Sequence, residues 1–198
     1  MNKIFIIVIL TVLVFAVPVG AKPEKIVMGP YNVSFDMENI STYSIKINPP
    51  AENKNLWGLP YTVYEATING SSEEIPHSAE ISILDFEGFV SNNIEEAVKV
   101  TADSSWCKES DAVVARRIDG KEGALSPACD FSIFVFGYPI ITIDGANLML
   151  ASVMASSTYP WDKGTSNLID TIHVEVSSSK DKDIEAAKMN RSQEATKE

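Results

Sequence analysis

The chain has 198 residues, of which 45% are hydrophobic and 22% are charged, a composition that excludes disorder over its whole length. Its formal net charge of −11 excludes a nucleic-acid-binding protein of the usual basic kind, because such a chain repels phosphate backbones. No Lys/Arg stripe offsets this charge, and Arg116-Arg117 is the only adjacent basic pair after the leader.

Residues 1–21 have the order of a secretory signal peptide. Lys3 gives a positive start, an apolar run follows from Ile4 to Val17, and Val19-Gly20-Ala21 supplies small residues for a peptidase. Cleavage after Ala21 predicts a secreted or cell-surface protein. The competing interpretation is an uncleaved N-terminal anchor. After leader removal we expect no transmembrane span, because the next apolar stretch, residues 131–143, is shorter than the roughly 20 residues a helix needs.

The first half of the predicted domain has the alternating pattern of strands. Tyr43, Ile45 and Ile47 alternate with polar residues, and Ala79, Ile81 and Ile83 repeat that pattern. Residues 51–60 are polar and predict a loop. Residues 61–68 predict a strand that ends in a hairpin at Asn69-Gly70, followed by a loop over residues 70–78.

A helix and then further strands are expected in the second half. Asn93 and Glu96 form a capping box before apolar residues at helical spacing. Residues 112–118 predict a strand, and residues 119–123 predict a turn in which Gly120 and Gly123 can take positive φ. Two apolar runs, residues 131–138 and 148–155, predict strands buried on both faces.

The end of the domain is predicted to be helical. One side of a closing helix would carry the apolar residues Leu168, Ile169, Ile172 and Val176. Its solvent-exposed side would include His173. Residues 177–198 are polar and predict a disordered or loosely helical tail. The sequence therefore predicts one α+β globular domain over residues 22–176.

Export also bears on the cysteines and on glycosylation. Cys107 and Cys129 are expected to form a disulfide bond, with two buried free thiols as the alternative. Four candidate N-glycosylation sites match the acceptor tripeptide, namely Asn32, Asn39, Asn69 and Asn190.

Three features together resemble a known family. They are the order of the predicted elements, the hairpin at residues 118–123, and the segment at residues 155–160 that precedes the leucine-containing stretch at residues 167–172. The chain is similar in these features to the PsbP/Mog1-type α/β/α sandwich, over residues 33–176. The resemblance implies an antiparallel sheet flanked by a few helices and a binding or accessory role. It carries over no functional residue, because the matching positions are architectural.

The sequence contains no catalytic, metal-binding or cofactor motif. We therefore expect a non-catalytic exported protein that binds an unidentified protein or envelope component, without a cofactor. Aromatic residues at element ends are candidates for its contact surface or, alternatively, for caps on the core edge: Trp57, Trp106, Tyr159 and Trp161. Two other functions remain open, a secreted hydrolase that uses acidic residues or a metal, and a structural component of the envelope.

Overall fold

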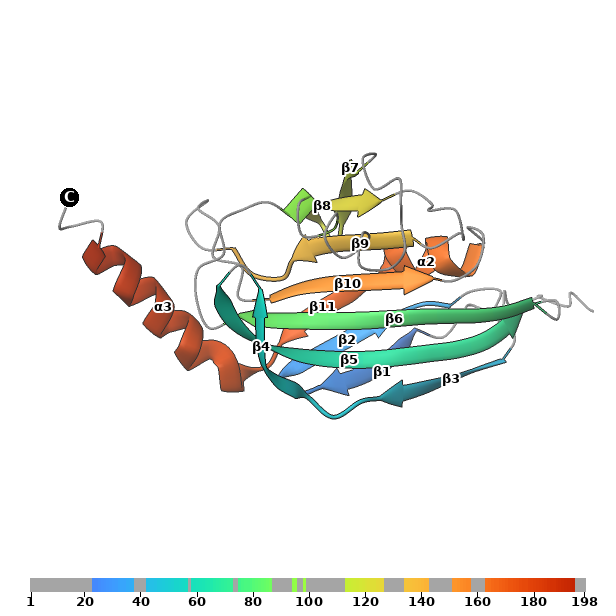
Figure 1. The fold of residues 1–198 in the computed structure, drawn as a ribbon, viewed down its shortest axis with the longest axis horizontal. Helices are drawn as coiled ribbons and strands as arrows, with labels where there is room; N and C mark the ends of the chain where they lie inside the picture. Colours follow the sequence, from blue (N-terminus) through green and yellow to red (C-terminus); the bar gives the residue numbers. More distant parts are fainter. Residues whose placement is uncertain are drawn as a thin grey trace, which may run out of the picture.

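Two antiparallel sheets form most of the protein (Figure 1). The computed structural model describes residues 23–37, 42–56, 58–72, 75–86, 94–95, 98, 113–126, 134–142, 151–157 and 163–194. The small sheet has three strands in the order β1-β2-β11, with β1 at Glu24–Met28, β2 at Tyr31–Phe35 and β11 at His173–Val176. The last strand of the described domain thus returns to pair with the second.

The large sheet has eight strands in the order β3-β5-β6-β10-β9-β8-β7, with β4 also paired to β5. Its first four strands are β3 (Thr42–Ile47), β4 (Ala51–Leu56), β5 (Leu59–Ser72) and β6 (Ile75–Phe86). The other four are β7 (Val114–Ile118), β8 (Lys121–Ser126), β9 (Phe134–Pro139) and β10 (Ala151–Ser157).

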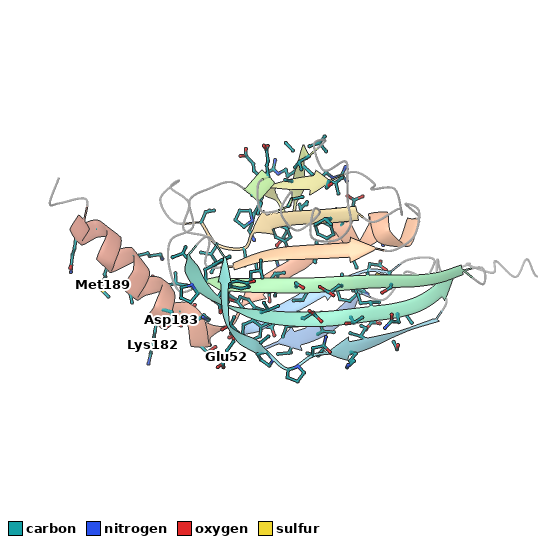
Figure 2. The ribbon with its side chains drawn as sticks, in the orientation of Figure 1. Glu52, Lys182, Asp183 and Met189 are labelled. Atoms are coloured by element: carbon teal, nitrogen blue, oxygen red, sulfur yellow. The ribbon has the colours of Figure 1, made fainter. Side chains whose placement is uncertain are left out.

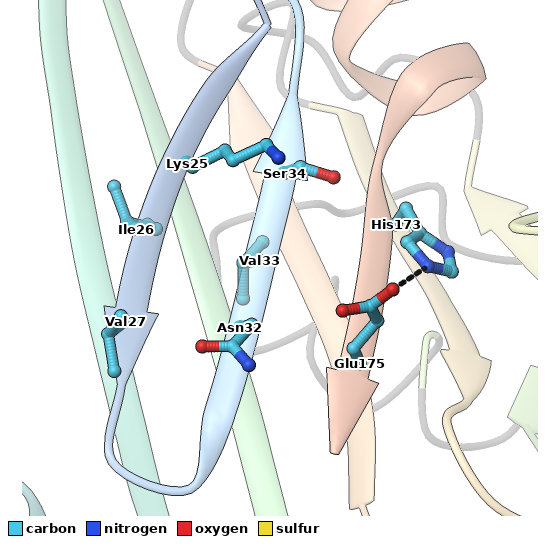
Figure 3. Close-up of a pocket in the computed structure, with 8 residues that line it drawn as sticks. All are labelled: Lys25, Ile26, Val27, Asn32, Val33, Ser34, His173 and Glu175. Carbon is cyan, nitrogen blue, oxygen red and sulfur yellow. Dashed lines mark ion pairs between the residues drawn. The ribbon is translucent and has the colours of Figure 1, made fainter. Parts of the chain in front are cut away.

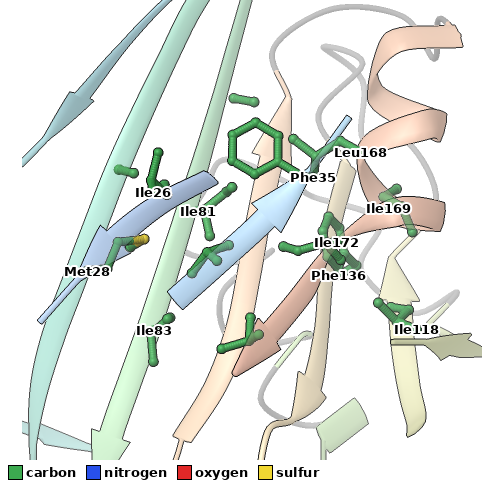
Figure 4. Packing of buried hydrophobic residues seen from close by; sticks show 14 of the residues in the cluster. Ile26, Met28, Phe35, Ile81, Ile83, Ile118, Phe136, Leu168, Ile169 and Ile172 are labelled. Atoms are coloured by element: carbon green, nitrogen blue, oxygen red, sulfur yellow. The ribbon is translucent and has the colours of Figure 1, made fainter. Parts of the chain in front are cut away.

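The main core lies between the two sheets and extends under helix α2 (Lys163–Thr171). Phe35 of the small sheet, Phe136 of the large sheet and Leu168 of α2 are each 1% exposed (Figure 4). Alternation explains this packing, because every second residue of a strand points to the same face. The opposite face of the large sheet carries two smaller apolar clusters, to which the helical residues Ile94 and Val98 contribute.

Several predicted elements are confirmed. Tyr43, Ile45 and Ile47 lie in β3, and Ala79, Ile81 and Ile83 lie in β6. The turn between β7 and β8 is Asp119-Gly120, with φ of 49° and 70°. Gly123 does not use positive φ and lies inside β8.

The predicted loop over residues 51–60 is wrong, because β4 and the start of β5 occupy it as a hairpin. A strand that pairs on only one edge and keeps exposed side chains such as Glu52 tolerates polar residues. The predicted hairpin at Asn69-Gly70 is also wrong. The β5–β6 ladder continues through Asn69↔Ser78 and Gly70↔His77 to Ser72↔Ile75, and this long ladder overrides a local turn preference.

The closing helix is shorter than predicted. α2 ends at Thr171, and residues 173–176 form β11 with His173 and Glu175 exposed and Val174 buried. The alternation of two valines with two polar residues fits a strand, and pairing with β2 buries Val174 in the core.

The polar tail is helical over much of its length, as the loosely helical alternative for residues 177–198 predicts. Residues Ser178–Lys180 form a 3₁₀ turn and Asp181–Glu194 form helix α3. Asp181 and Asp183 in the first turn favour the positive end of the helix dipole. The Lys180 ammonium lies 2.7 Å from the buried Asp85 carboxylate and joins the start of the helix to β6. Beyond that point α3 projects from the body, with Lys182, Asp183 and Met189 exposed (Figure 2).

The fold is therefore a β-rich α+β fold of antiparallel sheets with few helices.

Candidate functional site

The outer face of the small sheet forms an open groove with a volume of about 450 Å³. We call it the small-sheet groove. Six of its lining residues point away from the core, and Ile26 and Val33 belong to the core beneath (Figure 3). The six are Lys25, Val27, Asn32, Ser34, His173 and Glu175.

Strand register arranges these six side chains in two rows across the sheet. Lys25, Ser34 and His173 are directly paired in one row, and Val27, Asn32 and Glu175 are paired in the other. Paired residues on one face of an antiparallel sheet lie within about 5.5 Å of each other. The sequence folds this way because each strand alternates a core residue with an outward one, and the turn at Gly29-Pro30 fixes the register.

His173 connects the groove to the large sheet. Its Nδ1 lies 2.6 Å from Oδ1 of Asp119, and its Nε2 lies 3.4 Å from Oε1 of Glu175. The hydrogen bond to Asp119 raises the pKa of His173, against the lowering effect of burial. The ring is thus held toward its charged form between two carboxylates.

Asp119 has three hydrogen-bond partners, which come from the two strands β11 and β8. Its side chain is 9% exposed and accepts hydrogen bonds from His173, from Lys121 Nζ at 3.3 Å and from the Val174 main-chain N–H at 3.3 Å. Burial acts to raise the pKa of this carboxyl, but the hydrogen bond to His173 and the positive Lys121 outweigh it, so the pKa is lowered. Asp119 therefore holds the β7–β8 turn against β11 as a carboxylate.

The arrangement around His173 differs from a Ser-His-Asp nucleophile site. Ser34 is paired with His173 across the ladder, yet the imidazole lies on the side of β11 away from β2 (Figure 3). Its Nε2 faces Glu175 instead. A base must lie within hydrogen-bond reach of the nucleophile that it activates. The groove offers hydrogen-bonding and charged groups for a ligand rather than this reaction.

A second, more open concavity of about 710 Å³ lies on the other side of the Asp119-Gly120 turn. Its arginines are already engaged: Arg116 pairs with Asp170 of α2, and Arg117 Nε donates to the Gly120 carbonyl at 3.1 Å. These contacts satisfy the turn and the helix, which leaves this concavity with less unused hydrogen-bonding capacity.

Two acidic residues, Glu95 and Glu122, line the second concavity. Glu80, on the outer face of the large sheet, has a raised pKa from burial and from the nearby Glu65. Across the described ranges, no three His, Cys, Asp or Glu side chains are placed to hold a metal ion.

Only some of the site residues predicted from the sequence lie in the part of the chain that the structure describes. Asn32 is exposed in the groove, and Asn69 is exposed in β5. Asn190 lies in α3, and its side chain is outside the description. The remaining predicted residues lie outside the described ranges, namely Asn39, Trp57, Trp106, Cys107, Cys129, Tyr159 and Trp161.

Sequence reasoning missed the link between His173 and Asp119. It placed His173 on a helix surface and interpreted Asp119 only as a turn residue. The period-two pattern of residues 173–176 is the signal that could have identified the strand. The contact itself joins residues 54 positions apart and depends on how the two sheets pack.

No protein-family model, curated protein or solved structure matches the chain. Within the described residues, no helix is long and apolar enough to cross a membrane.

Proposed function

We propose that this is an exported, non-catalytic binding or accessory protein of the cell surface or extracellular space, and that the small-sheet groove is part of its contact surface. The observation that carries this proposal is the pair of cross-strand rows, which presents side chains of mixed chemistry on a sheet whose other face is packed in the core.

The groove suits recognition by hydrogen bonds. Lys25 supplies a cation, Glu175 a carboxylate, Asn32 an amide and Ser34 a hydroxyl. Among the described residues, the side chains of Lys25, Asn32 and Ser34 have no hydrogen-bond partner, so a ligand can use them without breaking internal bonds. Polar groups on a rigid frame lose little entropy on binding.

The resemblance to PsbP/Mog1-type domains supports the same role, and with it the finer proposal that the fold is an α/β/α sandwich of that kind. The leader at residues 1–21 supports export. Export places the groove in a compartment where its partner is a secreted or envelope component.

The predicted aromatic surface belongs to the proposal as a second contact region. Trp57 directly follows β4 in sequence, and Trp161 shortly precedes α2. Replacing both with Ala should weaken partner capture and leave the circular dichroism spectrum unchanged. If the double variant unfolds instead, these residues cap the core and do not form the contact region.

The direct experiment is quantitative capture of partners from the native extracellular and envelope fractions with immobilised mature protein. The test variant is Val27→Asp with Asn32→Arg, which changes one row of exposed groove residues. The matched control is Lys46→Glu, an exposed charge change on the outer face of the large sheet. The proposal expects loss of a saturable partner with the groove variant and retention with the control. Equal capture by all three proteins would contradict it.

A further inference from the structure

The free edge of β1 has the main-chain groups that pair strands. β1 is hydrogen-bonded only to β2, so one of its edges has no strand neighbour among the described elements. Met28 and Tyr31 close the two-residue turn, which makes Met28, Ile26 and Glu24 the residues that bond to β2. The N–H and C=O groups of Lys25 and Val27 therefore point to the open edge, where Val27 is 63% exposed.

An apolar shelf of β3 lies beyond this edge. Tyr43, Ile45 and Ile47 pair with Gly70, Ile68 and Ala66 of β5, so they share the core-facing side of the large sheet. Among the described strands, none of the small sheet lies opposite β3, and Ile45 is only half-buried while Ile47 is 47% exposed.

Two contacts place the shelf beside the edge. The Tyr43 hydroxyl donates to Glu24 Oε1 at 2.8 Å, and β1 packs against β5, the neighbour of β3. This hydrogen bond joins the beginnings of β1 and β3, and the two strands run in the same direction from there (Figure 1). Because β1 packs against β5, the neighbouring strand β3 extends beyond the free edge of β1 and forms a step. The width of this step is the spacing between β5 and β3, about 4.8 Å for neighbouring strands.

We propose that the partner binds here as one extended peptide segment, added antiparallel to β1 as a fourth strand of the small sheet. The inference rests on the proposed binding function and names the class of partner. The main chain of the segment bonds to Lys25 and Val27, its inward side chains are apolar and cover Ile45 and Ile47, and its outward side chains are polar and meet the groove. Strand addition of this kind takes affinity from main-chain bonds and specificity from alternate side chains.

The step favours a peptide over a second copy of the chain. Two copies that paired through β1 about a two-fold axis would each bring a large sheet whose β3 extends past the shared edge, and these sheets would collide. The net charge of −11 on each copy adds repulsion. The same charge favours basic residues that flank the bound segment.

The probe is a fluorescent peptide, Lys-Thr-Val-Thr-Val-Thr-Lys, measured by anisotropy against the mature protein. In antiparallel register the residues that bond to β1 have outward side chains, so they are the threonines. N-methylation of the threonine amides should abolish saturable binding, and N-methylation of the valine amides should leave it within about twofold. Equal binding of both modified peptides, loss with the valine form, or no saturable binding of the parent peptide would overturn the inference.

Protein variants give the matched test. Val27→Pro removes an edge N–H that bonds to no strand and leaves the ladder to β2 intact, whereas Val27→Thr keeps that N–H. We expect peptide binding to be about tenfold weaker for V27P than for V27T, because the two variants differ in the edge N–H. Ile47→Ser should also weaken binding by removing part of the apolar shelf. Equal affinity of V27P and V27T would contradict main-chain pairing, as would dimerisation that V27P abolishes.

The two proposals fail separately. If the groove variant loses its native partner while V27P retains it, the binding function stands and the strand-addition mode is wrong.

Discussion

The Nδ1 atom of His173 lies 2.6 Å from Oδ1 of Asp119, and this contact joins the last strand of the small sheet to the β7–β8 turn of the large sheet. Asp119 is nearly buried, whereas the His173 side chain is 51% exposed. The contact therefore couples a solvent-exposed titratable group in the groove to the packing of the two sheets.

The stability of the mature protein should depend on the protonation of His173. Its raised pKa means that the bond stabilises the fold fully below the ordinary value of 6.5 and loses this effect as pH rises through the raised value. The lowered pKa of Asp119 gives a contribution that is present above 3.8 and lost as pH falls through the lowered value. Between about pH 6 and 8.5 we expect a loss of less than about 1 kcal/mol, since His173 is half exposed.

Urea denaturation at a series of pH values measures this effect. His173→Gln should flatten the dependence between pH 6 and 8.5, and His77→Gln is the control that should preserve it. An unchanged pH dependence in H173Q would show that another group is responsible.

The ion pair between Lys180 and Asp85 should hold the start of α3 on the body. Lys180→Met leaves the Asp85 carboxylate, whose side chain is 7% exposed, without its cation. We expect the free energy of unfolding to fall by about 2 kcal/mol, because an unpaired buried charge is costly. Lys182→Met, at an exposed position in the same helix, should change it by less than about 0.5 kcal/mol. Chemical denaturation of both variants gives the comparison, and equal stabilities would mean that the pair does not anchor the helix.

Gly123 is required by close packing between β8 and β9. A Cβ atom there would lie 2.6 Å from the Gly137 carbonyl oxygen and 2.8 Å from Tyr138 Cβ, distances that real Cβ atoms essentially never show. Gly123→Ala should therefore destabilise the fold by about 1–3 kcal/mol in thermal or chemical unfolding. Gly120→Asn is the control, since this turn position has φ of 70° with open space around it, and Asn tolerates that conformation. A stable G123A protein would show that β8 and β9 can separate at little cost.

The proposed export makes a prediction about the mass of the native protein. Protein purified from its own extracellular or envelope fraction should begin at Lys22, and Cys107 and Cys129 should resist alkylation until a reductant is added. Intact mass spectrometry with and without reductant measures both. Because a glycan on Asn32 would cover the small-sheet groove, the binding proposal also expects that residue to be unmodified. Recovery of the chain with Met1 attached and two reactive thiols would contradict export.

The alternation of apolar and polar residues predicts several strands correctly. It does not predict the secondary structure where pairing with another strand decides between strand, turn and helix. The alternation at Ile81 and Ile83 predicts a strand, and this is correct because β6 buries one face in the core. Asn69-Gly70 has the composition of a turn, but the strand opposite it extends the ladder on both sides. Val176 fits a helical stripe and a strand equally well, and only the presence of β2 as a partner selects the strand.

The candidate site was less predictable than the strands. His173 is far in sequence from Lys25 and Asn32, and no motif in the sequence connects the three residues. They share a face because β11 returns to pair with β2, a topological fact that single-sequence patterns do not contain.

Site-specific photocrosslinking tests the central claim most directly. A benzophenone amino acid replaces Val27 at the edge of the groove or, as the control, Lys46 on the opposite side of the molecule, and each mature protein is irradiated in its native extracellular fraction. The proposed function predicts one saturable crosslinked product from position 27 that unlabelled protein competes away, and none from position 46. Equal crosslinking from both positions, or no product from position 27, would contradict the assignment of the small-sheet groove as the contact surface.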